Sequence, residues 1–128
     1  MIFIHAGCMS AGLLLLSVGV SGAMMMRKKE WWLRVHRRCG TAGVVGVLLG
    51  LAVALYMVSG QTGRHCAVPH AWLGIITVLA VVCTYLIGVA QLKMRVPRMR
   101  PLHRWVGRVT FALLVINVLS GLSLVGVM

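Results

Sequence analysis

The chain has 128 residues, of which 60% are hydrophobic, and its mean hydropathy is +0.97. Soluble domains are roughly 45–50% apolar, so this composition excludes an ordinary water-soluble globular protein. Thirteen Lys and Arg face a single acidic residue, Glu30, which gives a formal net charge of +12. Because the basic residues lie almost wholly in two short segments between apolar runs, they indicate membrane topology rather than nucleic-acid binding.

Four apolar stretches follow one another along the chain, at about 2–26, 35–59, 70–92 and 102–127. Each has ~23–26 residues, which is enough for a helix to cross the ~30 Å hydrocarbon core of a bilayer. The three connections are short, so neighbouring helices must run antiparallel. We therefore predict an all-α fold in which residues 1–128 form a single transmembrane domain, an integral membrane antiparallel four-helix bundle.

The first stretch carries His5 near its start, and basic residues follow this stretch instead of preceding it. A secretory signal peptide has its basic segment first and a shorter apolar segment after it, so we expect a retained membrane helix. Gly12 lies two turns beyond His5, on the same helical face. Cys8 lies in the same stretch, and the sequence leaves open whether it pairs with Cys66 of the middle connection or stays a small apolar side chain.

The other three stretches each begin with a histidine that is followed by a glycine four residues later. The pairs are His36 with Gly40, His70 with Gly74, and His103 with Gly107. In a helix, residues four apart lie on the same face, one turn from each other. Such a glycine leaves room beside the imidazole for a large planar group.

The basic residues predict how the helices are oriented. Twelve of the 13 lie in or beside the first and third connections, and only Arg64 lies in the middle one. By the positive-inside rule the first and third connections are cytoplasmic, so both termini and the middle connection face outward. His5 and His70 are then expected near the outer face, and His36 and His103 near the inner face.

In an up-down bundle the first and third helices are diagonal to each other, and so are the second and fourth. Each diagonal pair can direct two imidazoles at one iron, and bis-imidazole ligation is an established haem geometry. We predict two haem b groups, with His5 and His70 as ligands of the outer iron and His36 and His103 as ligands of the inner iron. A single histidine near a helix end is more often a snorkelling or hydrogen-bonded residue. Four histidines, one per helix and in two matched pairs, favour ligation.

Other polar residues near the histidines are candidates for contacts with the same cofactors. Arg37, Arg104 and Arg108 are predicted to pair with haem propionates; the alternative is that they set topology and contact anionic lipid. Arg108 lies more than a turn into its helix, where a charge needs a partner. Asn117, on roughly the His103 face, is predicted to donate to a haem or to bridge helices. His65, in the middle connection, is interpreted as a solvated residue, with a propionate as the alternative partner.

Around three of the histidines the chain resembles the transmembrane cytochrome b561 family. The segments are His5-Ala-Gly-Cys-Met9 with Gly12, similar to HPxxM; His70-Ala-Trp72-Leu-Gly74, similar to HSWxG; and Pro101-Leu-His103-Arg-Trp-Val-Gly107 with Phe111, similar to PxHxxxG. The resemblance covers nearly the whole chain and implies the dihaem four-helix core of that family, with the same histidine pairs. Family members usually have six helices and pass electrons from cytoplasmic ascorbate to an outer monodehydroascorbate or ferric acceptor. The basic cluster of this chain resembles the family's ascorbate site only in charge.

We therefore expect a dihaem b-type cytochrome that carries electrons across the membrane, as an electron carrier or a transmembrane oxidoreductase. The alternatives are a quinol-linked haem b subunit of a larger oxidoreductase complex, a small transporter or proton relay, and a structural assembly subunit. No Asp or Glu lies in any predicted helix, which disfavours a proton relay. Expected partners are membrane lipid and a redox partner on each face (ascorbate, quinol or a partner cytochrome subunit), in a homo-oligomer or larger complex. No motif identifies the donor, the acceptor, the direction of transfer or the potentials.

Overall fold

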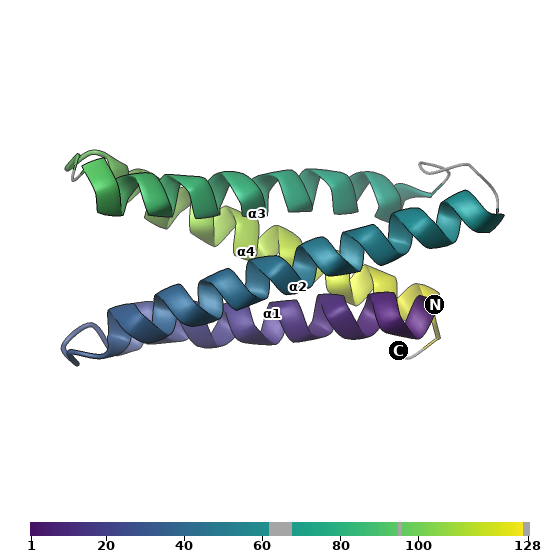
Figure 1. Ribbon diagram of the computed structural model, residues 1–128, viewed down its shortest axis with the longest axis horizontal. Coiled ribbons are helices and arrows are strands. Elements are labelled where there is room, and N and C mark those ends of the chain that lie inside the picture. The colour runs from purple at the N-terminus through teal and green to yellow at the C-terminus, as the bar shows by residue number, and fades with distance from the viewer. Residues whose placement is uncertain (62–67, 95, 127–128) are drawn as a thin grey trace. The chain divides into compact units, whose positions relative to one another are not determined.

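The computed structural model describes residues 1–61, 68–94 and 96–126 (Figure 1). These residues form four α-helices, and the described part of the chain contains no strand. The helices are α1 (Ile2–Met25), α2 (Trp32–Gln61), α3 (Pro69–Met94) and α4 (Met99–Leu124). All four are long and apolar enough to cross a membrane. The predicted all-α membrane fold is confirmed.

The helix bounds follow from the local sequence. Helix α3 begins at Pro69, and proline suits the first helical position because the N–H group that it lacks would have no partner within the helix there. Pro101 lies in the first turn of α4, where the same reasoning applies. Helices α2 and α4 begin at Trp32 and Met99, about three residues before the predicted starts, so their first turns take in part of the basic connections.

The chain divides into two compact units, residues 1–65 and 66–128. Each unit is a helical hairpin, α1 with α2 and α3 with α4, and the two hairpins are described separately below. The expectation of a single transmembrane domain stays a prediction. His65, Cys66 and Arg64 lie outside the described residues, and so does the predicted alternative of a pair between Cys8 and Cys66.

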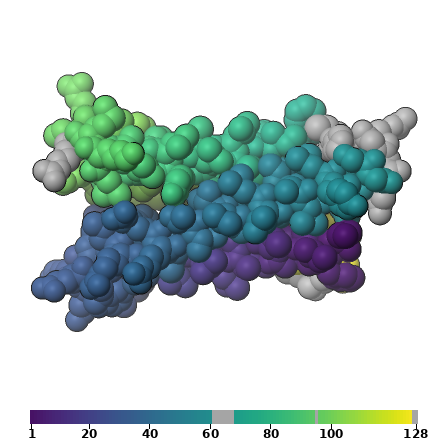
Figure 2. Space-filling model, in the orientation of Figure 1, coloured from purple at the N-terminus to yellow at the C-terminus, as the bar shows by residue number. Residues whose placement is uncertain are grey.

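Glycines bring α1 and α2 close together. A Cβ atom built on Gly12 would lie 2.9 Å from Val47 Cγ2 and 3.1 Å from the backbone oxygen of Gly43, and one on Gly46 would lie 3.3 Å from Gly12 Cα. Val47 is fully buried and Met9 is almost so. A Cβ atom built on Gly50 would lie 2.7 Å from the sulfur of Met9. Small residues allow such close approach between membrane helices. Figure 2 shows the side chains of α1 and α2 in contact along the hairpin. Gly43, Gly46 and Gly50 therefore allow α2 to pack closely against α1.

The interface between α3 and α4 is more polar. Leu114 and Val81 are buried there together with Thr77, Thr110 and Asn117. The Thr110 hydroxyl lies 2.8 Å from that of Thr84 and also donates to the backbone oxygen of Ala80 at 3.4 Å. Interhelical hydrogen bonds of this kind hold membrane helices together where no hydrophobic force acts between them.

The outward surfaces of the helices are apolar. Large side chains more than half exposed include Leu14, Tyr56, Leu79, Ile116 and Leu124, so every helix presents such residues. A water-soluble protein rarely exposes contiguous apolar surface of this extent. The surface therefore fits a chain whose helices are surrounded by lipid.

Candidate functional site

The four predicted ligand histidines each lie within the first two turns of a different helix: His5 in α1, His36 in α2, His70 in α3 and His103 in α4. Each side chain is partly buried. Because each helix in a hairpin runs against its neighbour, the start of one helix lies beside the end of the other. Each histidine therefore contacts the C-terminal half of the paired helix.

In the first hairpin both imidazoles bond to backbone oxygens of the paired helix. The Nδ1 atom of His5 lies 2.8 Å from the oxygen of Gly50, and Nδ1 of His36 lies 2.9 Å from that of Gly19. A carbonyl oxygen can only accept, so Nδ1 carries the proton and donates it. In the neutral ring Nε2 then has the lone pair, which is the form of imidazole that binds a metal.

The second hairpin repeats the arrangement with one difference. The Nδ1 atom of His103 lies 3.1 Å from the backbone oxygen of Thr84, whereas Nδ1 of His70 lies 3.1 Å from the side-chain oxygen of Ser120. The Ser120 hydroxyl donates to the backbone oxygen of Asn117 at 2.9 Å, so its oxygen accepts from His70. All four histidines thus present the same tautomer. Metal-ligating histidines typically donate the other ring N–H in this way, which fixes tautomer and ring orientation.

Two glycines seat the rings of the second hairpin. A Cβ atom on Gly121 would lie 2.9 Å from Cε1 of His70, and one on Gly88 would lie 2.9 Å from Cε1 of His103. Such a distance is too short for carbon atoms in contact, so a larger residue would displace the ring. Sequence reasoning did not identify either glycine as a contact of a histidine. They could have been identified from the antiparallel register of α3 against α4, because one register places Gly121 beside His70 and Gly88 beside His103.

The two histidines of one hairpin lie at opposite ends of it. His5 and Gly19, the partner of His36, are 14 residues apart in α1. Fourteen residues of helix span roughly 21 Å, at 1.5 Å per residue. His70 and Thr84, the partner of His103, have the same separation in α3. Neither hairpin alone can therefore bring its two histidines to one metal ion.

At three of the four glycines predicted to face a cofactor a Cβ atom would meet no clash, and beside Gly40 there is open space. A Cβ on Gly40 would meet no atom within 4 Å, one on Gly107 would lie 3.6 Å from Thr84 Cγ2, and one on Gly74 would lie 3.7 Å from Asn117 Nδ2. Gly12 is different, because it packs tightly against α2 as described above. The structure thus gives Gly12 a packing role, and its contact with a cofactor stays a prediction.

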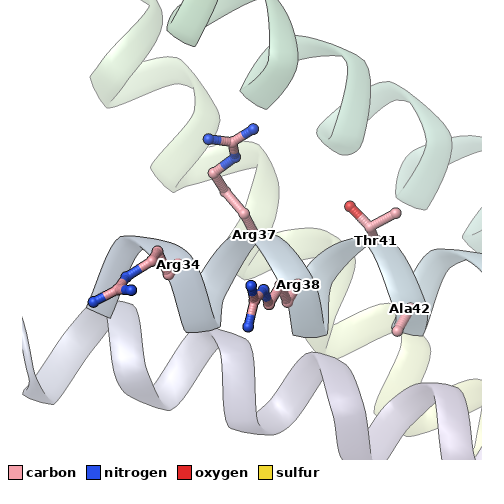
Figure 3. Close-up of a pocket in the computed structure, with 5 residues that line it drawn as sticks. All are labelled: Arg34, Arg37, Arg38, Thr41 and Ala42. Carbon is pink, nitrogen blue, oxygen red and sulfur yellow. The ribbon is translucent and has the colours of Figure 1, made fainter. Parts of the chain in front are cut away.

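The predicted arginines are exposed. The guanidinium carbon of Arg108 lies 5.7 Å from the centroid of the Trp105 ring, a cation–π contact between residues three apart in α4. Arg104 is exposed in the same turns of α4. Arg37 lines a pocket on α2 with Arg34, Arg38, Thr41 and Ala42 (Figure 3). These positions recur at helical spacing, so one side of α2 carries three positive charges close to His36.

Asn117 is almost fully buried between α3 and α4, with 2% of its surface exposed. Its side-chain oxygen has no hydrogen-bond partner among the described residues, and the same is true of the Thr77 hydroxyl, which is fully buried. A buried polar group without a partner costs free energy. The predicted contact between Asn117 and a haem stays a prediction.

The imidazole donors of the four histidines fit haem iron. Among the described residues there is no group of three His, Cys, Asp or Glu side chains that could hold an ion. Haem brings four of its own nitrogen donors and needs at most two from the protein, which imidazoles supply. The shared tautomer of the four rings and the open space beside Gly40 are consistent with this requirement.

Comparison with known proteins supports the same assignment. Curated proteins and solved structures give no significant match. A family model described as "Eukaryotic cytochrome b561" matches residues 1–127, which is essentially the whole chain. This agrees with the resemblance read from the histidine motifs. The chain belongs to the eukaryotic cytochrome b561 family, membrane proteins that transfer electrons across the bilayer through haem b.

Proposed function

We propose that this chain binds two haem b groups and conducts electrons between the two faces of the membrane. Haem supplies the one-electron chemistry, and the protein supplies ligands, orientation and burial. The observation that carries the proposal is that each hairpin has one histidine at each end, all four with Nδ1 donating to the paired helix. Two hairpins of this kind offer two imidazoles for each end of the membrane-spanning unit.

The proposed pairs are His5 with His70 and His36 with His103. Within a hairpin the histidines lie at opposite ends, so a bis-histidine pair needs one residue from each hairpin. The positive-inside rule assigns His36 and His103 to the cytoplasmic side, because the basic connections flank them. Two imidazoles of the protein would hold each haem, and a haem held in this way would supply one-electron transfer instead of oxygen or substrate activation.

On the cytoplasmic side we propose a small anionic electron donor such as ascorbate. The pocket lined by Arg34, Arg37, Arg38 and Thr41 supports this, because it combines positive charge with a hydroxyl within two turns of His36. Quinol and a partner cytochrome subunit are the alternatives that the donor assay below distinguishes.

Arg104 and Arg108 are proposed to interact with the propionates of the haem at the cytoplasmic end, and Asn117 with the haem at the other end.

The central test is a haem count and a reduced-minus-oxidised spectrum of the purified chain in detergent. Two b-type haems per chain are expected, and a chain without haem would exclude the proposal in favour of a transporter or a structural subunit. Stopped-flow mixing with ascorbate or with a quinol then identifies the donor class. Rapid reduction by one of them indicates that donor, and reduction by neither indicates a partner cytochrome subunit. Replacement of Arg37 by Gln should slow reduction by ascorbate and leave reduction by an uncharged quinol unchanged.

The pairing has its own test in the substitution His70→Ala. One haem should be lost and the other retained, with the spectrum of the retained haem unchanged. His5→Ala should remove the same haem, whereas His36→Ala and His103→Ala should both remove the other. If His70→Ala and His103→Ala removed the same haem, the proposed pairs would be wrong.

A further inference from the structure

His70 differs from the other three histidines in the chemistry of the group that holds it. His5, His36 and His103 donate to backbone oxygens, which no substitution removes. His70 donates to the hydroxyl of Ser120, a side chain that a single substitution deletes. One ligand out of four is therefore oriented by a residue whose identity matters.

The hydroxyl proton of Ser120 already has an acceptor. The hydroxyl donates to the backbone oxygen of Asn117 at 2.9 Å, in the same helix, and this bond fixes the rotamer of the side chain. The lone pairs of Oγ are thereby turned toward His70, whose Nδ1 lies 3.1 Å away. The result is a short relay in which His70 donates to Ser120 and Ser120 donates to the backbone.

The relay acts together with the seat formed by Gly121. A Cβ at position 121 would lie 2.9 Å from Cε1 of His70, so the ring lies directly against the backbone of α4. Gly121 limits how far the ring can tilt, and Ser120 limits how far it can rotate about its own axis. Adjacent residues of α4 thus determine the orientation of a ligand carried by α3.

We propose that Ser120 is a positioning residue for His70 and lowers the reduction potential of the haem that His70 ligates; this rests on the function proposed above. An imidazole that donates its Nδ1–H becomes more electron-rich at Nε2, and a more electron-rich ligand favours the ferric state. Loss of the hydroxyl reverses this effect for one haem only. The other haem keeps backbone acceptors at both of its ligands and serves as an internal reference.

The experiment compares Ser120→Ala with Ser123→Ala in the purified chain with its haems. Ser123 lies on the same helix and makes a similar bond, from its hydroxyl to the backbone oxygen of Leu119 at 3.1 Å. It is exposed, and among the described residues its hydroxyl makes no hydrogen bond to a histidine. Redox titration should show the midpoint potential of one haem rising in Ser120→Ala, with the other unchanged. A hydrogen bond worth about 0.5–1.5 kcal/mol corresponds to roughly a two- to tenfold rise in the ferrous-to-ferric ratio at fixed potential. Ser123→Ala should leave both potentials as in the unmodified chain.

Two further measurements distinguish positioning from a general loss of structure. Ser120→Thr retains the hydroxyl and should restore the potential. The low-spin ferric electron paramagnetic resonance signal of the affected haem should shift in Ser120→Ala, because that signal reports ligand-ring orientation, and return in Ser120→Thr. Unchanged potentials and signals in Ser120→Ala, with both haems bound, would overturn the role of Ser120 alone. An unmodified chain that binds no haem would instead overturn the proposed function.

Discussion

A Cβ atom on Gly88 of α3 would lie 2.9 Å from Cε1 of His103 in α4. The same distance separates a Cβ on Gly121 of α4 from Cε1 of His70 in α3. Each helix of the second hairpin therefore provides both a histidine and the glycine that makes room for the other helix's histidine. The two ends of the hairpin repeat one local design.

This reciprocity predicts which haem each glycine affects. Gly88→Ala should displace the ring of His103, and Gly121→Ala that of His70, because a methyl group cannot fit at that distance. In each variant we expect the haem affinity of one site to fall about 10–100-fold. This is the range seen when groups that orient metal ligands are removed. Haem titration with spectral resolution of the two sites measures this. If both variants lost the same haem, the assignment of the seats would be wrong.

Gly40 tests the space beside His36. An alanine there meets no atom within 4 Å, and helix propensity favours alanine over glycine by about 1 kcal/mol. Gly40→Ala should therefore leave the hairpin as stable as before or more stable, yet weaken the haem at the His36 end if the macrocycle occupies that space. Gly60→Ala, in the same helix and equally open, is the matched control and should keep both haems. Full haem occupancy in Gly40→Ala would show that the macrocycle lies elsewhere.

Gly12 separates a packing role from a cofactor role. A Cβ there meets Val47 Cγ2 at 2.9 Å and backbone atoms at 3.1 Å, and backbone cannot move aside as a flexible side chain does. Gly12→Ala should destabilise the chain by about 1–3 kcal/mol, the usual cost of overpacking. Gly7→Ala is the control, because no atom lies within 4 Å of its Cβ. Chemical unfolding in mixed micelles measures both, and equal stability of the two variants would contradict the close approach of α1 and α2.

In the polar interface of α3 and α4, two threonine substitutions should have different effects on the free energy of unfolding. Thr84→Val removes a hydrogen bond to Thr110 and should cost about 0.6 kcal/mol, the average for such bonds in a membrane protein. Thr77→Val removes a buried hydroxyl that has no partner among the described residues, so stability should be unchanged or rise. The same unfolding assay compares them. A greater loss in Thr77→Val than in Thr84→Val would mean that the Thr77 hydroxyl is bonded in the folded protein.

Much of the fold was predictable because it depends on composition and spacing. Stretches of membrane length with few charges have few alternatives to helices, and the structure has a helix at each of the four predicted stretches. The histidines lie near the helix starts as expected, since each lies near the start of an apolar stretch. The start of α2 at Trp32 was missed because the apolar pattern begins later than the backbone hydrogen bonding.

The partners of the histidines were not predictable in the same way. Gly19, Gly50 and Thr84 act through backbone oxygens, and a backbone oxygen has no signature in the sequence. Ser120 and the two ring-seating glycines, Gly88 and Gly121, do have side-chain identities that matter. Finding them requires the register of α3 against α4, which depends on packing between helices.

The hydrogen bonds to backbone oxygens in the first hairpin make the orientation of its histidines depend on residue spacing within the helices. His5 donates to Gly50, and His36 donates to Gly19. Both hydrogen bonds therefore depend on the number of residues between these positions in α1 and in α2. Inserting one residue between His5 and Gly19 would rotate one end of α1 by about 100° relative to the other, because a helix has 3.6 residues per turn. Both rings could not then keep their acceptors. Point substitutions along this hairpin leave the spacing intact, whereas an insertion or deletion of a single residue between these positions changes it for both histidines at once.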